Sequence, residues 1–272
     1  GHQVGDVDRG RIYRIAPKGS DYEIPKAEVA SIPGAVKALV NPNPATRFLG
    51  WNALASAGSN AEGALKELWT SGGPRQKAQA IWLLSRLPGK EDEYINLALS
   101  DQDTNLRITG IRIARSLHKD ILPVATKLVD DSSPQVRREV AIALRGNSSP
   151  EAAKLWTQLA KQYDGKDRWY LEALGIAADG NWDLYFSAWK NDVGTDWNTP
   201  VNRDIVWRSR SKESMPLMAE LIKSSNEQEM LRYYRSFDFQ TDPSKQRILA
   251  QLVQETEGDK VLYALKHMDA AK

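Results

Sequence analysis

VDDSSPQVRREVAIALR, residues 129–145, repeats a pattern that LSDQDTNLRITGIRIAR shows 30 residues earlier, at 99–115. Two earlier copies begin at residues 39 and 69, so the period is 30 residues. Self-similarity at a fixed period of about 20 to 50 residues is the sequence signature of repeat architectures, in which each unit stacks on its neighbours. This repeat therefore decides the fold.

Each copy begins a helix. A proline stands in register at Pro44, Pro74 and Pro134, and Thr104 fills the same position in the third copy. At the first position of a helix the missing N–H of proline costs nothing, and its fixed φ favours the helical turn. Apolar residues at spacings of three and four follow, which predicts an amphipathic helix. Another apolar-periodic segment precedes the proline or threonine of the later copies, at 60–70, 91–100 and 119–129. Each unit is therefore a pair of helices, which can bury its apolar face only by stacking on the next pair.

Three columns of the repeat have a predicted structural role. A basic residue recurs at Arg47, Lys77, Arg107 and Arg137, and a short polar or acidic residue stands six positions before each, at Asn41, Ser71, Asp101 and Asp131. We expect each turn residue to face the arginine of its own unit, as a structural ladder, with Lys77 opposite Ser71 as the weak step. The third column holds Gly50, Ala80 and Gly110, small residues that let the next helix approach closely. Such 30-residue helical pairs resemble the HEAT-like family of α-solenoids.

The fifth unit contains KDRWYLEALGIAADGNWD, residues 166–183, and departs from the pattern. Asp167 falls in the basic column and Lys161 in the acidic one, so we predict a ladder pair of reversed sign. Asp179-Gly180 is predicted to end the helix, with glycine in the left-handed conformation. Trp169 stands in a column that holds no large aromatic in the earlier units, so we predict that Trp169, with Arg168 beside it, lies on an exposed interaction surface.

The period loosens after about residue 180. Three more helix pairs are predicted, 181–194 with 201–211, 212–224 with 226–237, and 242–256 with 259–269 as the C-terminal cap. With 24–40 as the first helix, the fold class is an all-α, right-handed α-solenoid of about seven HEAT-like pairs over residues 24–272. Residues 1–23 are predicted to be a lead-in from a preceding domain, in which RGRIYRIAPKGS (9–20) has a strand-like pattern. We interpret Gly1 as a cloning remnant and the chain as a piece of a larger protein.

Three segments carry a second resemblance: GRIYRIAPKG (10–19), DRWYLEALGIAADGNWD (167–183) and WNTPVNRDIVWRSRS (197–211). They are similar to large exported bacterial proteins in which a β-propeller like that of sugar (glucose/sorbosone) dehydrogenases precedes a HEAT-like region and a cytochrome c-type haem-binding domain. The resemblance implies that this chain is the middle region, docked to the propeller and the cytochrome c-like domain, and that it is periplasmic or otherwise exported. The chain lacks a Cys-x-x-Cys-His motif and a propeller, so the parent protein could be an enzyme while this piece is not.

Composition argues against most chemistry in this chain. It has no cysteine and three scattered histidines, which excludes thiolate ligands, disulfides and c-type haem attachment and disfavours a histidine metal site. No glycine-rich phosphate loop, Gly-x-Ser-x-Gly elbow or helical zinc motif occurs. The net charge of +2 falls short of the basic bias of a dedicated nucleic-acid binder, and no apolar run could span a membrane. We therefore expect no catalytic residue, cofactor or metal.

Six of the nine tryptophans lie between residues 156 and 207. They fill an irregular core, or they form an aromatic patch for docking. RDIVWRSRSK (203–212) holds four basic residues, which are ordinary helix-end cations or an anion-binding patch. The candidate interaction surface comprises Trp169, Arg168, Trp182, Trp197, Arg203, Arg208 and Arg210.

Two functions of different class follow. The first is a non-catalytic interaction or spacer solenoid within a multidomain exported protein, docking neighbouring domains or another protein. The second is a HEAT-like DNA glycosylase or another nucleic-acid-binding solenoid, since such enzymes use Trp, Asp and Arg on a comparable helical surface. The modest net charge and the strand-like lead-in favour the first.

Overall fold

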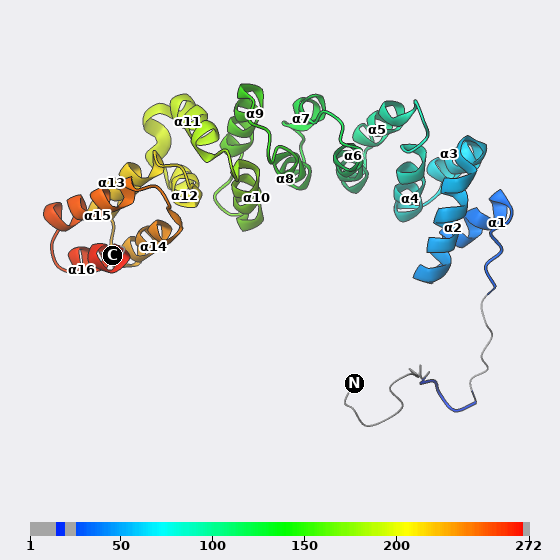
Figure 1. Cartoon of the computed structure of the whole chain (residues 1–272), viewed down its shortest axis with the longest axis horizontal. Helices are drawn as coiled ribbons and strands as arrows, with labels where there is room; N and C mark the ends of the chain where they lie inside the picture. The colour runs from blue at the N-terminus through cyan, green and yellow to red at the C-terminus, as the bar shows by residue number, and fades with distance from the viewer. Residues whose placement is uncertain (1–14, 20–25, 269–272) are drawn as a thin grey trace. The chain divides into compact units, whose positions relative to one another are not determined.

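The computed structural model describes residues 15–19 and 26–268 (Figure 1). The described residues form two compact units, which divide between Ala57 and Gly58. The described residues form helices and turns and contain no strand. The predicted strand-like lead-in falls largely outside the described residues. Of its described part, residues 15–19 have no helix or strand, and Ile15 is exposed.

The helices come in consecutive pairs, as predicted. The first unit contains α1 (Ile32–Leu39) and α2 (Pro44–Ala57). The second contains α3 (Glu62–Ser71), α4 (Pro74–Leu84), α5 (Glu91–Leu99), α6 (Thr104–Ser116), α7 (Leu122–Leu128), α8 (Pro134–Ala143), α9 (Pro150–Lys161), α10 (Arg168–Ala178), α11 (Trp182–Val193), α12 (Pro200–Arg208), α13 (Ser214–Ser224), α14 (Glu227–Ser236), α15 (Ser244–Glu255) and α16 (Asp259–His267). The described residues therefore hold eight pairs, one more than the sequence estimate of about seven.

Local chemistry explains where these helices begin. Proline occupies the first turn of α4 and α8. In α6 the cap is Asp103, whose side chain accepts a hydrogen bond from the N–H of Asn105. A side-chain oxygen that satisfies a free N–H at a helix start stabilises the helix by about 1 kcal/mol. Asp167 caps α10 in the same way, accepting from the N–H groups of Trp169 and Tyr170.

Successive pairs stack within the second unit. The helices α5, α7, α9 and α11 form one row, and α6, α8 and α10 form the other (Figure 1). Between the rows lies a continuous core of Leu, Ile, Val and Ala side chains, among them Ile81, Ile111, Val140 and Leu174. Each pair buries its apolar face on its neighbours, which confirms the α-solenoid.

The small-residue column acts inside a pair, not between pairs. A Cβ atom added at Gly110 of α6 would lie 2.9 Å from Leu99 Cδ2 and 3.1 Å from Ala98 Cβ, both on α5. In the first unit, Gly50 of α2 would meet the backbone of Leu39 at 2.5 Å, on α1. The expectation that these glycines admit the next helix is therefore wrong, because the close approach is to the preceding helix of the same pair.

The irregular region after residue 180 continues the stack, with α11 against α9 and α12 against α10. Helix α10 ends at Ala178, and Gly180 is left-handed with φ of 81°, as predicted. Helix α11 ends at Val193, and a short 3₁₀ helix, η2 (Gly194–Asn198), follows it before α12. The predicted helices 181–194 and 201–211 correspond to α11 and α12.

Candidate functional site

The basic column forms a ladder, but its carboxylate contact joins neighbouring pairs. Arg107 Nη1 donates to the backbone carbonyls of Asp101 and Gln102 in its own unit, at 3.0 and 2.9 Å. Its Nε and Nη2 donate to the carboxylate of Asp131 in the next unit, at 2.7 and 2.8 Å. Burial acts to raise the pKa of Asp131, but the hydrogen bonds from Arg107 and from the Ser133 N–H outweigh it and lower this pKa. The prediction that Asp101 and Asp131 face the arginines of their own units through their side chains is therefore wrong, because backbone carbonyls fill that role.

The same backbone contact recurs in other units. Arg47 donates to the carbonyls of Asn41 and Pro42, and Arg137 donates to those of Asp131 and Ser132. The backbone carbonyl of the turn residue thus accepts a hydrogen bond from the arginine of the same unit, and this contact does not depend on the turn residue's side chain. This explains why Asn41 and Asp101 are interchangeable in the column.

The ladder stops at the fifth unit. The position equivalent to Asp131 in the fifth unit is Lys161, so Arg137 has no carboxylate partner there. Its guanidinium instead lies 5.6 Å from the centre of the Tyr170 ring. Lys161 binds Asp192 at 2.7 Å, and Asp167 lies 3.4 Å from Arg138. The predicted sign-reversed pair of Lys161 with Asp167 is therefore wrong, since each residue has a different partner.

The tryptophan cluster divides into core and surface. Trp156 and Trp189 are fully buried, and Trp156 donates from its indole nitrogen to the Leu174 carbonyl at 2.9 Å. Trp182 and Trp207 are half-buried, as is Trp197 on η2. Trp169 alone among the six is exposed, at 72%. The packing interpretation thus holds for most of the cluster, and the exposure predicted for Trp169 is confirmed.

Three of the six other predicted surface residues, Arg168, Arg208 and Trp182, belong to one network around Glu172. Glu172 accepts from Arg168 at 2.6 Å and from Arg208 at 2.9 Å. Arg208 lies over the Trp182 ring, and Arg168 lies over the ring of Trp207. Burial acts to raise the pKa of Glu172, but the two arginines hold it below its usual value. Trp182 and Arg208 therefore have structural partners within the fold.

The remaining two candidate arginines lie apart from Trp169. Arg203 donates to Asn198 of η2 at 2.9 Å, and Arg210 lies 4.6 Å from the centre of the Phe239 ring. Burial, helped by the charge of Arg208, lowers the pKa of Arg210 to about 10. These contacts do not bring the four basic residues of 203–212 into one patch.

Trp169 forms one wall of a groove across α6, α8 and α10. The groove has a cavity volume of about 570 Å³, within the range of about 300 to 1,000 Å³ that is usual for ligand pockets. Its apolar lining comes from Trp169 with one isoleucine of each helix, Ile108, Ile142 and Ile176. Its polar lining consists of Asn105, Arg112, Gln135, Arg138, Glu139 and Glu172.

Glu139 occupies the position that corresponds to Trp169 one unit earlier. Its carboxylate binds Arg112 at 2.8 Å and Arg115 at 3.5 Å, and it is buried. The expectation that this column lies near the surface therefore fails at Glu139, because two arginines of α6 cover it. The carboxylate of Glu139 also raises the pKa of Arg112.

The polar lining of this groove left a signal in the sequence that the ladder obscured. Asn105 and Gln135 are 30 residues apart, as are Glu139 and Trp169, so lining positions outside the ladder also recur at the period. The apolar lining left no comparable signal, since an isoleucine on a second helix has the same spacing whether it lines a groove or the core.

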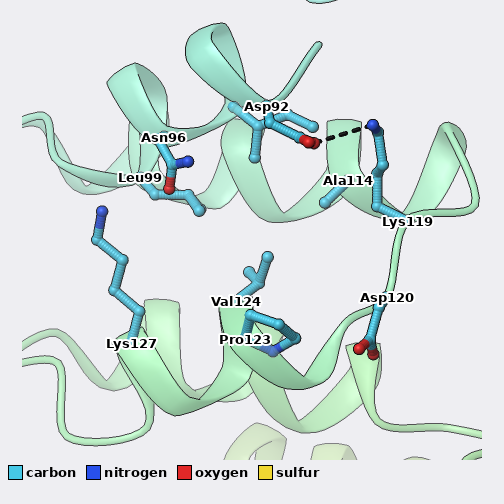
Figure 2. A pocket seen from close by; sticks show the side chains of 10 residues that line it. Asp92, Asn96, Leu99, Ala114, Lys119, Asp120, Pro123, Val124 and Lys127 are labelled. Carbon is cyan, nitrogen blue, oxygen red and sulfur yellow. Dashed lines mark ion pairs between the residues drawn. The ribbon is translucent and has the colours of Figure 1, made fainter.

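A second hollow lies between α5 and α7 (Figure 2). Its volume is about 430 Å³, and Leu99, Val124 and Pro123 contribute apolar surface to it. Lys119 and Asp92 close one side through an ion pair of 2.9 Å. No exposed aromatic side chain lines this hollow, unlike the groove at Trp169.

The described part of the chain has no grouping of His, Asp or Glu side chains that could hold a metal ion. Nor do its helices include one that is both long and apolar enough to cross a membrane.

Comparison with known proteins agrees with the helical pairs. A family model for HEAT repeats matches residues 91–175, which run from the start of α5 into α10. No curated protein matches the sequence. A solved crystal structure of an engineered protein, from the Northeast Structural Genomics Consortium, is 14% identical, with 87% of this chain and 77% of that chain covered and a TM-score of 0.37. The helices of the described residues, with HEAT repeats matched over residues 91–175, make this part of the chain an all-helical α-solenoid.

Proposed function

We propose that this chain is a protein-binding solenoid and that the groove of α6, α8 and α10 is its binding surface. The observation that carries the proposal is Trp169, which is 72% exposed at the wall of that groove. HEAT repeats commonly mediate protein interactions, and the matched repeats include all three helices.

The cost of exposing Trp169 supports this use. An apolar side chain gains roughly 25 cal/mol for each Å² removed from water, and a tryptophan offers up to about 250 Å². Hot spots of protein interfaces are enriched in Trp, Tyr and Arg. Arg112 and Arg138 line the groove with Trp169, and the exposed Arg168 lies next to Trp169 in the sequence, so both residue types are present.

The arginines of this face support a protein partner over a nucleic acid. Arg112, Arg138 and Arg168 each bind a carboxylate of the same face, in Glu139, Asp167 and Glu172 respectively. Asp167 and Glu172 keep 31% and 27% of their side chains exposed, so carboxylates interrupt the surface along which a long phosphate backbone would run. The nucleic-acid alternative therefore lacks the uninterrupted basic surface that phosphate contacts favour.

The setting of the solenoid rests on the sequence resemblance alone. We place it in an exported, periplasmic bacterial protein, between a dehydrogenase-like propeller and a cytochrome c-type domain. In that setting the chain has no catalytic role of its own, and its groove serves a neighbouring domain or a separate protein.

Selection of phage-displayed random peptides on the immobilised chain tests the binding function. Selected peptides would be synthesised, labelled and titrated by fluorescence anisotropy. We expect Trp169→Ala to weaken their binding by about tenfold or more. Phe239→Ala removes another exposed aromatic, outside the groove, and should leave binding unchanged. Failure to enrich any peptide, or equal binding by Trp169→Ala, would overturn the proposal.

A further inference from the structure

We infer that the groove takes an acidic segment of a partner protein with an apolar side chain that packs against Trp169. This inference rests on the proposed function and adds the chemistry of the partner. It depends on how the charges of the groove are layered.

At two ion pairs of the groove the arginine is more exposed than its carboxylate. Arg112 has 59% of its side chain exposed, while its partner Glu139 has 9%. Arg168, next to Trp169, has 65% exposed, against 27% for Glu172. An approaching segment therefore meets these two guanidinium groups before the carboxylates that hold them in place.

The count of charges favours an anionic partner by a single charge. The groove lining has two arginines, Arg112 and Arg138, and two carboxylates, Glu139 and Glu172. Arg168, which follows Asp167 and precedes Trp169, binds Glu172 and brings the sum for the groove and its edge to +1 (3 − 2).

The arginines also have N–H groups to spare. A guanidinium has five N–H donors in a planar fork that matches a carboxylate. Arg112 donates to Glu139 through Nη2. A partner carboxylate at the rim would add charge-assisted hydrogen bonds to such groups without displacing the internal pairs.

The groove also has an apolar part. Ile142 and Ile176 line it beside Trp169, and Ala173 is buried next to them. This surface suits one aliphatic or aromatic side chain of the partner. Carboxylates on either side of that side chain would then lie near the two arginines.

Three synthetic peptides of equal length test the inference. The first has one leucine among aspartates and glutamates. The second replaces every carboxylate with an amide, and the third replaces the leucine with serine. In anisotropy titrations at low salt, we expect the first peptide to bind about tenfold more tightly than either of the others. Raising the salt should weaken the first peptide most, because its ion pairs at the rim are exposed.

Variants assign the binding to the groove. Arg112→Gln with Arg168→Gln should reduce the first peptide to the affinity of the amide peptide, whereas Arg112→Lys with Arg168→Lys should retain most of the difference. Arg235→Gln, an exposed arginine of α14 outside the groove, is the control. Unchanged circular dichroism and thermal midpoint would show that each variant is folded.

The outcomes separate this inference from the proposed function. Equal affinity of the acidic and amide peptides would overturn the acidic specificity, while phage-selected peptides that depend on Trp169 would still support protein binding. Displacement of all peptides by lower concentrations of duplex DNA, dependent on Arg112 and Arg168, would overturn both in favour of a nucleic-acid ligand.

Discussion

Arg107 of α6 donates two hydrogen bonds, of 2.7 and 2.8 Å, to the carboxylate of Asp131 in the turn of the next helix pair. The same guanidinium binds two carbonyls of its own turn. One side chain thus connects the turns of consecutive units and fixes their spacing. Because 13% of Arg107 and 8% of Asp131 remain exposed, water screens this pair little.

Loss of the Asp131 charge should therefore weaken the stack. We expect Asp131→Asn to lower the free energy of unfolding by about 2 kcal/mol, because a largely buried arginine loses its anionic partner. The control is Asp179→Asn, whose partner Arg145 forms an exposed pair at 2.6 Å. That substitution should cost less than about 1 kcal/mol. Urea unfolding measures both, and equal losses would contradict the role given to the ladder.

Acid should destabilise the second unit through Glu62 of α3. Its carboxylate binds Lys90 at 2.6 Å, the Tyr94 hydroxyl and Lys66, which together lower its pKa from 4.5 to about 2. The unfolded chain then binds this proton first, so stability from Glu62 is complete above pH 4.5 and is lost as the pH falls from 4.5 towards 2.

The test compares urea midpoints across that pH window. Glu62→Gln should be less stable than the wild type at neutral pH and should show a shallower loss on acidification. Glu67→Gln, an exposed carboxylate of the same helix, should leave the slope near that of the wild type. Parallel curves for wild type and Glu62→Gln would contradict the assignment.

The helix pairs could be predicted because their causes are local. Proline at helix starts, apolar spacing and a glycine stop at Gly180 act over a few residues, so a 30-residue register identifies them. The partner of Arg107 could not be predicted in this way. A register says which positions are equivalent, but Asp101 and Asp131 are both acidic, and only the stacking of pairs decides which carboxylate the arginine reaches.

Of the groove residues, the sequence predicted the exposed Trp169 but not the buried Glu139. Trp169 departs from its column, and a departure is visible in one sequence. Glu139 fits the mostly polar column, so nothing in the sequence marks it, and its burial depends on Arg112 and Arg115 of another helix. Which polar side chains a neighbouring unit covers is a property of packing, which periodicity does not encode.

Replacing His118 with glycine should stabilise the protein. It ends α6 in the left-handed region, with φ of 53°, where Gly146 and Gly180 end α8 and α10. Its neighbour Lys119 donates to the Ala114 carbonyl at 3.0 Å, which closes the helix end. A side chain in this conformation costs about 1 kcal/mol, so His118→Gly should raise the free energy of unfolding by about that amount. His118→Ala should give no such gain, and equal gains in urea unfolding would show that the imidazole itself was unfavourable.

Gly110 should not tolerate a methyl group. An added Cβ would press on Leu99 and Ala98, so Gly110→Ala should destabilise the chain by about 1–2 kcal/mol despite the better helix propensity of alanine. Gly63 of α3 has open space around it, and Gly63→Ala should stabilise by about 0.5–1 kcal/mol. Thermal and urea unfolding of the two variants checks the opposite signs, and a stabilised Gly110→Ala would mean that α5 and α6 are not so closely packed.

Two tryptophans 13 residues apart in the sequence should behave in opposite ways. Trp156 is fully buried and bonded to the Leu174 carbonyl, so Trp156→Ala should cost about 3–5 kcal/mol of stability. Trp169→Ala should change stability by less than about 0.5 kcal/mol, because its side chain is largely in water already. The same substitution should abolish most peptide binding in the groove. A large loss of stability in Trp169→Ala would show that this side chain packs within the fold. Trp169 would then not be free to contact a partner, and the proposed binding surface would be wrong.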